Sequence, residues 1–483
     1  MNTAETRARQ SGEFDEEVRA ERDEKASEAH LSAALATFAV DTPAEAIPAS
    51  VSSWVKHLVL DAAGNAYAST RYEFAHRALT ALRGLDEGQS IVIGMPVRLT
   101  VRDAALMNGI LIHGLDFDDT YLPGNVHLTA SVVPTVLALG SRLNVRGADV
   151  LTACTLGLEA GMRLAAAAKG AFLKAGFHPT GLCGAFASVL AASRLLRLDH
   201  AQTVTAQGLV LSSASGTMQS TQEGAWAKRM HPGLMASAAI TAAYLAREGF
   251  SGPKQTYEGK YGLFSCFMGQ YAGDVDFDVV TDSLGSRWEC TRTSIKLYPA
   301  CFQSHAAMNA ALELRREEGV DVQQIESIRA RIANVAVPLV CEPLDEKRKP
   351  RDSYAAQFSL PYALACCFTR GHFGLEEIEE PSFSDSLLLA LAHKVSYEID
   401  PDAGFPKYRS GEVIVKLKNG KEVSRRNNIL PDDPAPAEAI VGKFMENTRC
   451  SMSVARSHSI ADVILNLDKA EAATILSDTL GGP

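Results

Sequence analysis

The fold is decided by residues 176–198, which read GFHPTGLCGAFASVLAASRLLRL. Phe186, Val189 and Leu190 recur at the three- to four-residue spacing of one helix face, and most other positions are Ala, Gly or Ser. The same composition continues over residues 148–247 without the alternation of a β-strand. Because small residues let helices approach closely, this part of the chain predicts a packed all-helical domain.

The pattern changes further along the chain. Residues 325–337 (IESIRARIANVAV) and 411–424 (GEVIVKLKNGKEVS) alternate apolar and polar side chains, as β-strands do. The second run contains Asn419-Gly420, a dipeptide typical of a two-residue hairpin turn. Helical segments between the two runs complete a smaller α+β domain.

These patterns predict a mainly α protein with four consecutive parts. The parts are a disordered or fraying tail at 1–30, a large all-helical domain at 31–280, an α+β domain at 281–430, and C-terminal helices at 431–483 that return to the helical domain. The tail is rich in Glu, Arg and Ala and lacks an apolar core, so it is neither a secretory signal nor a transit peptide.

The composition excludes several classes of function. A formal net charge of −10 at pH 7 disfavours nucleic acid as a partner, since phosphate binding needs a basic face. The nine cysteines form no CxxC pair, which disfavours a disulfide framework, a zinc site and an iron–sulfur cluster. No apolar run predicts a membrane span. We therefore expect a reducing, cytoplasmic location, with no membrane partner and with room for an anionic small substrate.

Chemistry-bearing side chains are concentrated in residues 113–134, which read HGLDFDDTYLPGNVHLTASVVP. The stretch holds three carboxylates, a hydroxyl and an imidazole, namely Asp116, Asp118, Asp119, Thr120 and His127. An acidic helix end followed by a turn is the alternative interpretation. Packing alone does not require so many aspartates beside apolar neighbours, so the stretch predicts one wall of a reactive site. In this interpretation Asp118 and Asp119 shape the loop.

Further segments place polar side chains where proline marks a helix start. They are His178-Pro179, Lys228 to His231-Pro232, Lys296 to Pro299, and Ser359 to Pro361-Tyr362. Proline suits the first helical turn, and the free N–H groups there attract anions. Each proline alone is explained by ordinary helix initiation. Convergence of these ends would instead form a pocket for a small polycarboxylate, with basic walls made of His127, His178, His231, Lys228 and Lys296.

A carboxylate ligand beside a positioned base suits removal of a proton from the carbon next to the carboxylate. His127 can serve as acid or base near neutral pH, and Asp116 can orient a histidine or accept a proton. Lys228 can neutralise the developing charge, and Tyr362 can donate a proton. Loss of water, loss of CO₂ or return of the proton can then follow.

We expect neither a metal nor an organic cofactor. Adjacent aspartates point in different directions, and no second ligand cluster supports Mg²⁺. No phosphate-binding glycine loop suggests pyridoxal phosphate, and no GxSxG motif supports serine hydrolysis. Cys301 is an alternative nucleophile, although a small polar residue at a helix start is the better explanation.

Five motifs, taken in order, resemble successive signatures of the MmgE/PrpD family. They read LIHGLDFDDT, GFHPTGLCGAFASVLAASRLLRL, AKRMHPGLMASAAITAAYLAREGFSGP, IKLYPACFQSH and FSLPYALA. Together they cover about residues 45–450. The resemblance implies a large helical domain, a smaller α+β lid domain, a cofactor-free active site between the two, and a homodimer.

The resemblance also implies positions for the site. The matching residues are Asp116 and Thr120 in the acidic loop, His127 closing it, His178 in the FHP motif, Lys228 before the His231 motif, and Lys296 and Tyr362 in the lid. Two departures stand out. Leu128 follows His127 where many members have proline, which affects the shape of the loop. Cys301 stands where animal-type cis-aconitate decarboxylases carry histidine, which disfavours their mechanism but not a fungal-like one.

We therefore predict a cofactor-independent lyase that acts on a small di- or tricarboxylate. Dehydration of a 2-methylcitrate-like hydroxy acid is the first interpretation, and decarboxylation of cis-aconitate is the alternative within lyases. Epimerisation of an amino- or iminodicarboxylate and a non-catalytic binding protein are alternatives from other classes. The predicted catalytic residues are Asp116, His127, Lys228 and Tyr362, and the predicted substrate-binding residues are Thr120, His178, His231, Lys296 and Cys301.

Overall fold

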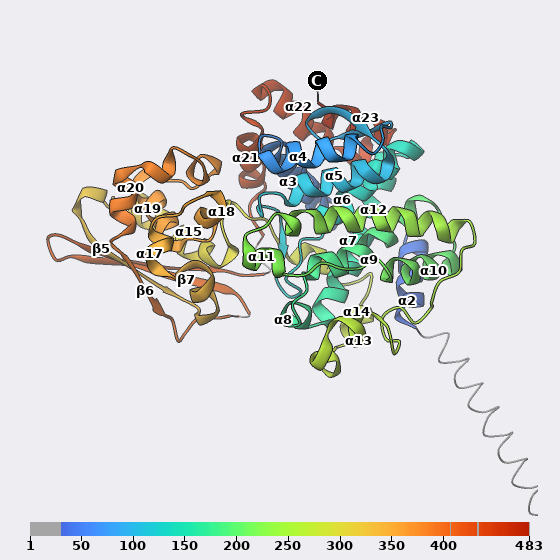
Figure 1. Cartoon of the computed structure of the whole chain (residues 1–483), viewed down its shortest axis with the longest axis horizontal. Coiled ribbons are helices and arrows are strands. Elements are labelled where there is room, and N and C mark those ends of the chain that lie inside the picture. Colours follow the sequence, from blue (N-terminus) through green and yellow to red (C-terminus); the bar gives the residue numbers. More distant parts are fainter. Residues whose placement is uncertain (1–29, 406, 432–433, 483) are drawn as a thin grey trace, which may run out of the picture.

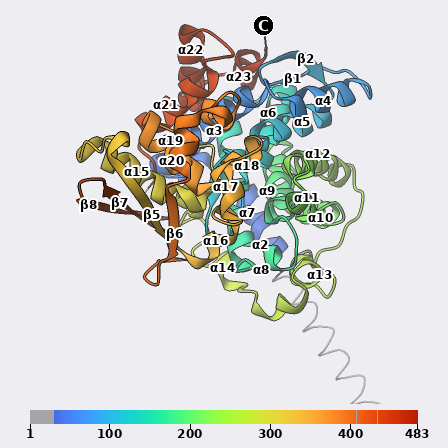
Figure 2. The same ribbon diagram turned by 60° about the vertical axis from the view of Figure 1, so that its left-hand side comes forward.

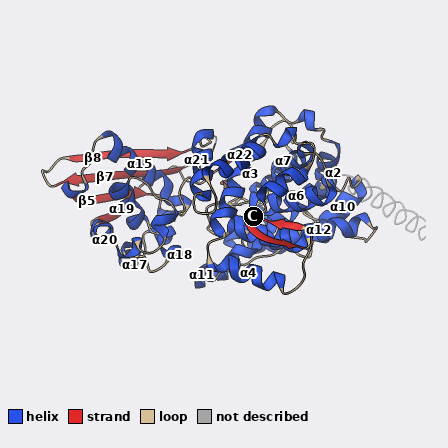
Figure 3. Cartoon of the chain, turned by 90° about the horizontal axis from the view of Figure 1, so that it is seen from above, coloured by secondary structure: helices blue, strands red, loops and turns tan. Residues whose placement is uncertain are grey.

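Figure 1 shows the computed structural model of the chain, which describes residues 30–405, 407–431 and 434–482. The predicted tail at 1–30 therefore lies, except for His30, outside the described residues. A larger lobe consists almost entirely of helices, and a smaller lobe combines helices with a sheet (Figure 3). The expectation of a mainly α protein is confirmed.

The larger lobe is built from long helices rich in buried alanine, glycine and leucine. They are α2 (Leu31–Asp41), α3 (Ala49–Ser69), α4 (Glu73–Arg83), α5 (Val101–His113), α6 (Thr129–Leu143), α7 (Gly147–Ala167), α9 (Pro179–Leu195), α10 (His200–Leu211) and α12 (Ala227–Arg247). Shorter elements join them, namely α8 (Ala171–Lys174), α11 (Gln219–Glu223), α13 (Leu263–Phe267), α14 (Asp278–Thr281) and the antiparallel pair β1 (Ser90–Val92) and β2 (Met95–Leu99). Helix α9 packs against α6, α7 and α12, and it is buried at every position except Arg194. This burial on all sides explains its alanines and glycines.

Helices α5 and α12 cross at two glycines. A Cβ atom on Gly109 would lie 2.4 Å from the Cα of Gly233, and one on Gly233 would lie 2.2 Å from the carbonyl oxygen of Leu106. Both distances are far below van der Waals contact, so a larger side chain would push the helices apart. The crossing brings the end of α5, with His113, beside the start of α12, with Lys228.

Helix α7 is, within the described residues, the one helix long and apolar enough to span a membrane. The expectation that the chain holds no such run is therefore wrong. However, 94% of the apolar window is buried inside the structure. The window also holds an ion pair between Glu159 and Arg163, whose Oε1 and Nε lie 2.6 Å apart and are fully buried. Burial to this extent is typical of a core helix in a soluble protein.

The smaller lobe contains a four-stranded sheet in the order β6-β5-β7-β8. Its strands are β5 (Ile325–Ile332), β6 (Val395–Ile399), β7 (Arg409–Leu417) and β8 (Glu422–Ile429), and its helices are α15 (His305–Glu317), α16 (Val337–Val340), α17 (Leu344–Arg348), α18 (Ser353–Gln357), α19 (Leu360–Arg370) and α20 (Ser386–Ala392). Strand β5 is parallel to β6 and antiparallel to β7, and the β7–β8 pair confirms the predicted hairpin. In Figure 2, α15 lies over this sheet, and it contacts β7 and β8.

Three details of the predicted elements are corrected. The strand predicted at 325–337 ends at Ile332, because a 3₁₀ turn and α16 follow. Pro232 lies inside α12, which already begins at Ala227, and Pro299 lies in a bend ahead of α15. Pro179 and Pro361 do start helices.

The C-terminal helices lie against the larger lobe (Figure 1). They are α21 (Ala437–Thr448), α22 (Val454–Leu465) and α23 (Ala473–Leu480). Helix α21 packs along α3, where Lys443 Nζ lies 2.5 Å from Asp61 Oδ1 in a buried ion pair. The same ammonium donates to the carbonyl oxygen of Phe117, so α21 supports the loop that follows α5.

Candidate active site

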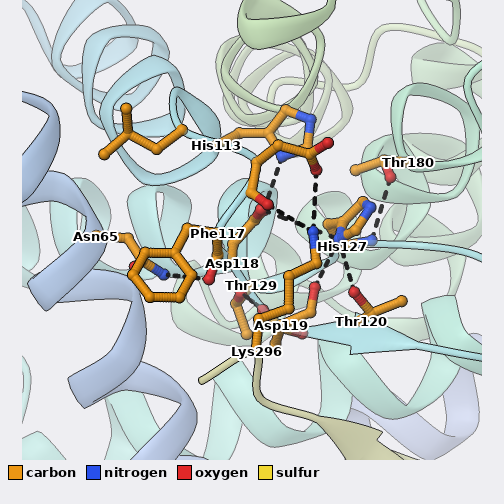
Figure 4. A network of polar contacts seen from close by, with 12 residues as sticks. Asn65, His113, Phe117, Asp118, Asp119, Thr120, His127, Thr129, Thr180 and Lys296 are labelled. Carbon is orange, nitrogen blue, oxygen red and sulfur yellow. Dashed lines mark hydrogen bonds and ion pairs between the residues drawn. The ribbon is translucent and has the colours of Figure 1, made fainter. Parts of the chain in front are cut away.

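The loop between α5 and α6 is the centre of a dense polar cluster (Figure 4). It is joined by the start of α9, the first turns of α12, and the segment after β4 (Thr293–Ser294). Strand β4 pairs with β3 (Thr120–Tyr121) in the loop, with Thr120 opposite Ser294. This pairing sets Lys296, two residues further along the chain, over the aspartates of the loop.

Asp116 is the acceptor for two ammonium groups. Its Oδ1 lies 3.2 Å from Lys228 Nζ and 3.1 Å from Lys296 Nζ, and Lys296 also donates to its carbonyl oxygen at 2.6 Å. Burial acts to raise the pKa of Asp116, but the two lysines outweigh it and hold that pKa well below its ordinary value. Asp116 also has a φ of 50°, a left-handed backbone conformation that is uncommon outside glycine and is often found at functional sites.

Asp118 forms a buried pair with His113, a residue that the sequence interpretation did not select. His113 Nδ1 lies 2.7 Å from Asp118 Oδ2, and both side chains are almost fully buried. Although burial acts to raise it, the neighbouring histidines lower the pKa of Asp118 to about 2. Asp118 is therefore a charged partner of the imidazole cluster, and its assignment to loop shaping alone is incomplete. In the sequence, this pair was indicated only by the position of Asp118 five residues after His113, the last residue of α5.

Asp119 has a different environment. It accepts a hydrogen bond from the hydroxyl of Thr129. Burial and the nearby charge of Asp118 raise its pKa well above the ordinary value. The pKa values of two adjacent carboxyl groups are thus shifted in opposite directions, because imidazoles act on Asp118 whereas burial and the charge of Asp118 act on Asp119.

His127 is held as a neutral imidazole. Burial lowers its pKa to about 3. Its Nδ1 lies 2.6 Å from the carbonyl oxygen of Asp119, which can only accept, so Nδ1 carries the proton. Thr120 Oγ1 lies 3.3 Å from the same nitrogen. This tautomer leaves Nε2 as the basic nitrogen, which is the arrangement that a general base requires.

His178 and His231 continue the cluster. Their Nδ1 atoms lie 3.1 Å apart, so one of the two nitrogens must carry the shared proton. The ring of His178 stacks on that of His113 at 5.4 Å and lies 6.4 Å from that of His127. Burial lowers the pKa of His178 well below its ordinary value and that of His231 to about 4. These shifts favour the neutral form of His178 and His231 at neutral pH, in which each ring can pass or receive a proton.

Cys301 lies near this cluster, whereas Tyr362 does not. The charges of Lys296, Asp116 and Lys228 act on the Cys301 thiol, although burial raises its pKa. A raised pKa favours the protonated thiol, which does not support a nucleophilic role. Tyr362 is fully buried, and its hydroxyl donates to the carbonyl oxygen of Glu377 at 2.8 Å. The expectation that Tyr362 faces the site is therefore corrected, because helix α19 turns this side chain into its own lobe.

The immediate surroundings supply groups that sequence reasoning missed. Tyr354, Gln357 and Arg229 line a small cavity together with Asp116 and Lys228. Gln357 also donates to the carbonyl oxygen of Leu115 at 2.5 Å, which ties α18 of the smaller lobe to the loop after α5. Arg229 lies within the quoted AKRMHP motif but was not selected, and no quoted motif covers Tyr354 or Gln357.

Ligand atoms of His113, Asp116 and Asp118 lie within 4.8 Å of one another, a spacing that a metal ion could use. However, Asp116 already meets two ammonium groups, and Asp118 meets an imidazole. The two ammonium groups already supply Asp116 with the positive charge that a divalent ion would bring.

A larger cavity than the one at Asp116, of about 570 Å³, lies elsewhere, between the C-terminal helix α21 and the smaller lobe. Phe117, Tyr298 and Lys443 line it, and none of the nine predicted site residues does. We place the candidate site at the polar cluster because cavity size alone supplies no proton-transfer chemistry.

Comparison with known families agrees with the order of the motifs. The family model of the MmgE/PrpD N-terminal domain matches residues 33–274, and that of the C-terminal domain matches residues 298–469. The chain belongs to the MmgE/PrpD family. The resemblance inferred from the five motifs is thereby confirmed. Asp116 and His127 lie in the first domain, and Lys296 lies between the two.

Several members of the family are similar over nearly their whole length. The cis-aconitate decarboxylase-like protein oryM of Aspergillus oryzae is 25% identical over 473 residues, which cover 94% of this chain and 98% of that protein. A cis-aconitate decarboxylase of Aspergillus terreus is 28% identical over 478 residues, which cover 94% of this chain and 96% of that protein. The cis-aconitate decarboxylase of Homo sapiens is 28% identical over 447 residues, which cover 89% of this chain and 90% of that protein. The last two of these relatives are named decarboxylases, which are lyases, the class of enzyme that was predicted for this chain.

Proposed function

We propose that this protein is a cofactor-independent carboxy-lyase that converts cis-aconitate, or a closely similar unsaturated tricarboxylate, to an itaconate-like product and CO₂. The observation that carries the proposal is the pair of lysine ammonium groups on Asp116 beside neutral imidazoles. The names of the full-length relatives support decarboxylation over dehydration of 2-methylcitrate, which was our first interpretation.

The reaction needs charge stabilisation and one proton. When the bond to the departing carboxylate breaks, its electron pair shifts across the double bond to the far alkene carbon, which takes up a proton. Before protonation, negative charge spreads onto the carboxylate attached to that carbon. Lys228 and Lys296 are suited to stabilise this charge, because both are largely buried and already converge on one point.

The imidazoles are suited to supply the proton. His178 and His231 share one proton between their Nδ1 atoms, and His127 has a basic Nε2 that can receive and return another. Asp118 would stabilise a transient imidazolium, since its Oδ1 lies 4.0 Å from His127 Nδ1. In this scheme the same carbon from which a dehydratase would remove a proton instead receives one.

Proton NMR in D₂O separates the candidate reactions. Purified protein is incubated in parallel with cis-aconitate, 2-methylcitrate, citrate and chiral dicarboxylates. We expect itaconate that carries one solvent deuterium in its saturated CH₂ group. An alkene formed from 2-methylcitrate would favour the dehydratase instead, and deuterium exchange without elimination would favour an epimerase.

The Lys228→Met variant, purified identically, reports any activity from contaminating enzymes. If wild-type protein leaves all the acids unchanged, or if the variant matches it, the proposal is wrong.

A further inference from the structure

The smaller lobe holds a buried arginine that forms no ion pair with any described residue. Arg409, the first residue of β7, is buried to 5% exposure. Its Nε and Nη1 have no hydrogen-bond partner among the described residues. Its guanidinium carbon lies 4.6 Å from the centroid of the Phe405 ring, a contact that further removes it from water. Burying an unpaired charge is costly, so such a group points to an absent anion.

The direction in which Arg409 faces follows from the packing of β7. A Cβ atom on Gly411 would lie 2.5 Å from the backbone nitrogen of Ala307, so this face of β7 lies against the start of α15. Residues two apart on a strand share a face, so Arg409 also faces this helix end.

The start of α15 lacks its own negative group. Its first turn carries no acidic residue, and the N-cap Ser304 makes no capping hydrogen bond with its side chain. The Ser304 hydroxyl is buried without a partner among the described residues. A helix N-terminus disfavours cations and attracts anions, so an anion between the two would stabilise Arg409 in this position.

Cys301 links this position to the polar cluster. It precedes α15 by four residues. Burial lowers the pKa of Arg409 to about 10, and the charge of the nearby Cys301 thiolate would act to raise it. The charges of Lys296, Asp116 and Lys228 act on the same thiol. The Arg409 guanidinium and the paired lysines therefore both lie within electrostatic reach of Cys301.

We infer that Arg409 and the N-terminus of α15 bind a second carboxylate of the substrate, one that is not lost in the reaction. The inference rests on the proposed function for the nature of the ligand. Lys228 and Lys296 carry two positive charges and Asp116 carries one negative charge, so the cluster favours one further negative charge. Arg409 favours a second one. A substrate with carboxylates at both ends would bridge the two lobes, whereas a monocarboxylate would leave Arg409 unpaired.

Binding measurements test this inference independently of turnover. Isothermal titration calorimetry compares propane-1,2,3-tricarboxylate with glutarate and methylsuccinate, each of which lacks one of its carboxylates. Arg409→Gln should weaken tricarboxylate binding roughly 10- to 100-fold, the range for one charge-assisted hydrogen-bonded contact. At least one dicarboxylate should bind wild type and variant alike, because it lacks the group that Arg409 holds. Equal binding of all three acids by wild type and variant would overturn the inference.

Two further variants separate binding from folding. Arg425→Gln is the matched control, since Arg425 lies on the neighbouring strand and pairs with Glu317 at 2.5 Å at the surface. It should bind all three acids as wild type does. Arg409→Met should unfold at the same temperature as wild type or a higher one, because it removes an uncompensated buried charge. A lower unfolding temperature with unchanged tricarboxylate affinity would assign Arg409 a structural role and overturn the inference.

Kinetics distinguish failure of this inference from failure of the proposed function. If wild type decarboxylates cis-aconitate, Arg409→Gln should raise KM with little change in kcat, as expected for a contact present before and during the reaction. An unchanged KM would overturn the inference and leave the function in place. If the wild type is inactive but Arg409→Gln binds the tricarboxylate more weakly than the wild type does, the proposed function is wrong and the anion site stands.

Discussion

Replacement of Asp116 by asparagine is the sharpest test of the charge arrangement. The side chain keeps its size but loses the charge that two ammonium groups share. Asp116, Lys228 and Lys296 have side-chain exposures of 19%, 15% and 4%, so water screens the three charges only in part. After the substitution the two lysines would face each other across a neutral amide.

The size of the effect follows from the distances. At 3.1 Å and an effective dielectric constant of about 20, one pair of unit charges attracts by roughly 5 kcal/mol. Desolvation offsets much of that attraction, and breaking a buried pair by removing one partner costs about 3–5 kcal/mol. We therefore expect Asp116→Asn to lower the free energy of unfolding by about 3–5 kcal/mol.

Equilibrium urea unfolding at neutral pH measures this loss, and a second substitution tests its cause. Lys228→Met in the Asp116→Asn background should recover part of the stability, because only one unpaired ammonium then remains. As a control, Asp468→Asn breaks the pair with Lys56, in which the carboxylate is 42% exposed, and should cost less than about 1 kcal/mol. A loss below about 1 kcal/mol for Asp116→Asn, or strictly additive effects in the double variant, would refute the reasoning.

Three other variants probe single residues. His127→Ala should lower turnover by about 10²-fold or more, because it removes the basic nitrogen of the site; near-wild-type kinetics would exclude it from proton transfer. Tyr362→Phe should leave kcat within about threefold, since its hydroxyl serves a backbone carbonyl, and a loss beyond about tenfold would return it to the active site. Burial lowers the pKa of His305 to about 3, so only the unfolded chain takes up its proton as the pH falls below about 6.5. Stability should therefore fall between pH 6.5 and 3, and His305→Gln should reduce that slope by about 1.4 kcal/mol per pH unit in urea unfolding; identical slopes would contradict this.

Local pattern alone determined the main architecture. The small residues of 176–198 predicted a helix surrounded by other helices, and α9 is buried on every side. The alternation around Asn419-Gly420 predicted the β7–β8 hairpin. Both predictions succeed because neighbours within a few residues set the periodicity of buried side chains and the conformation of a tight turn.

Only the tertiary structure decided which polar groups meet. Proline at 232 suggested a helix start, yet α12 already begins at Ala227, and Lys228 still reaches Asp116. Tyr362 matched a family motif but faces its own lobe. Arg409 lies in an ordinary strand sequence, and its isolation became visible only when the face of β7 was known. Side-chain direction and burial depend on elements far apart in the chain, so residue types and spacing could nominate members of the site but could not assemble it.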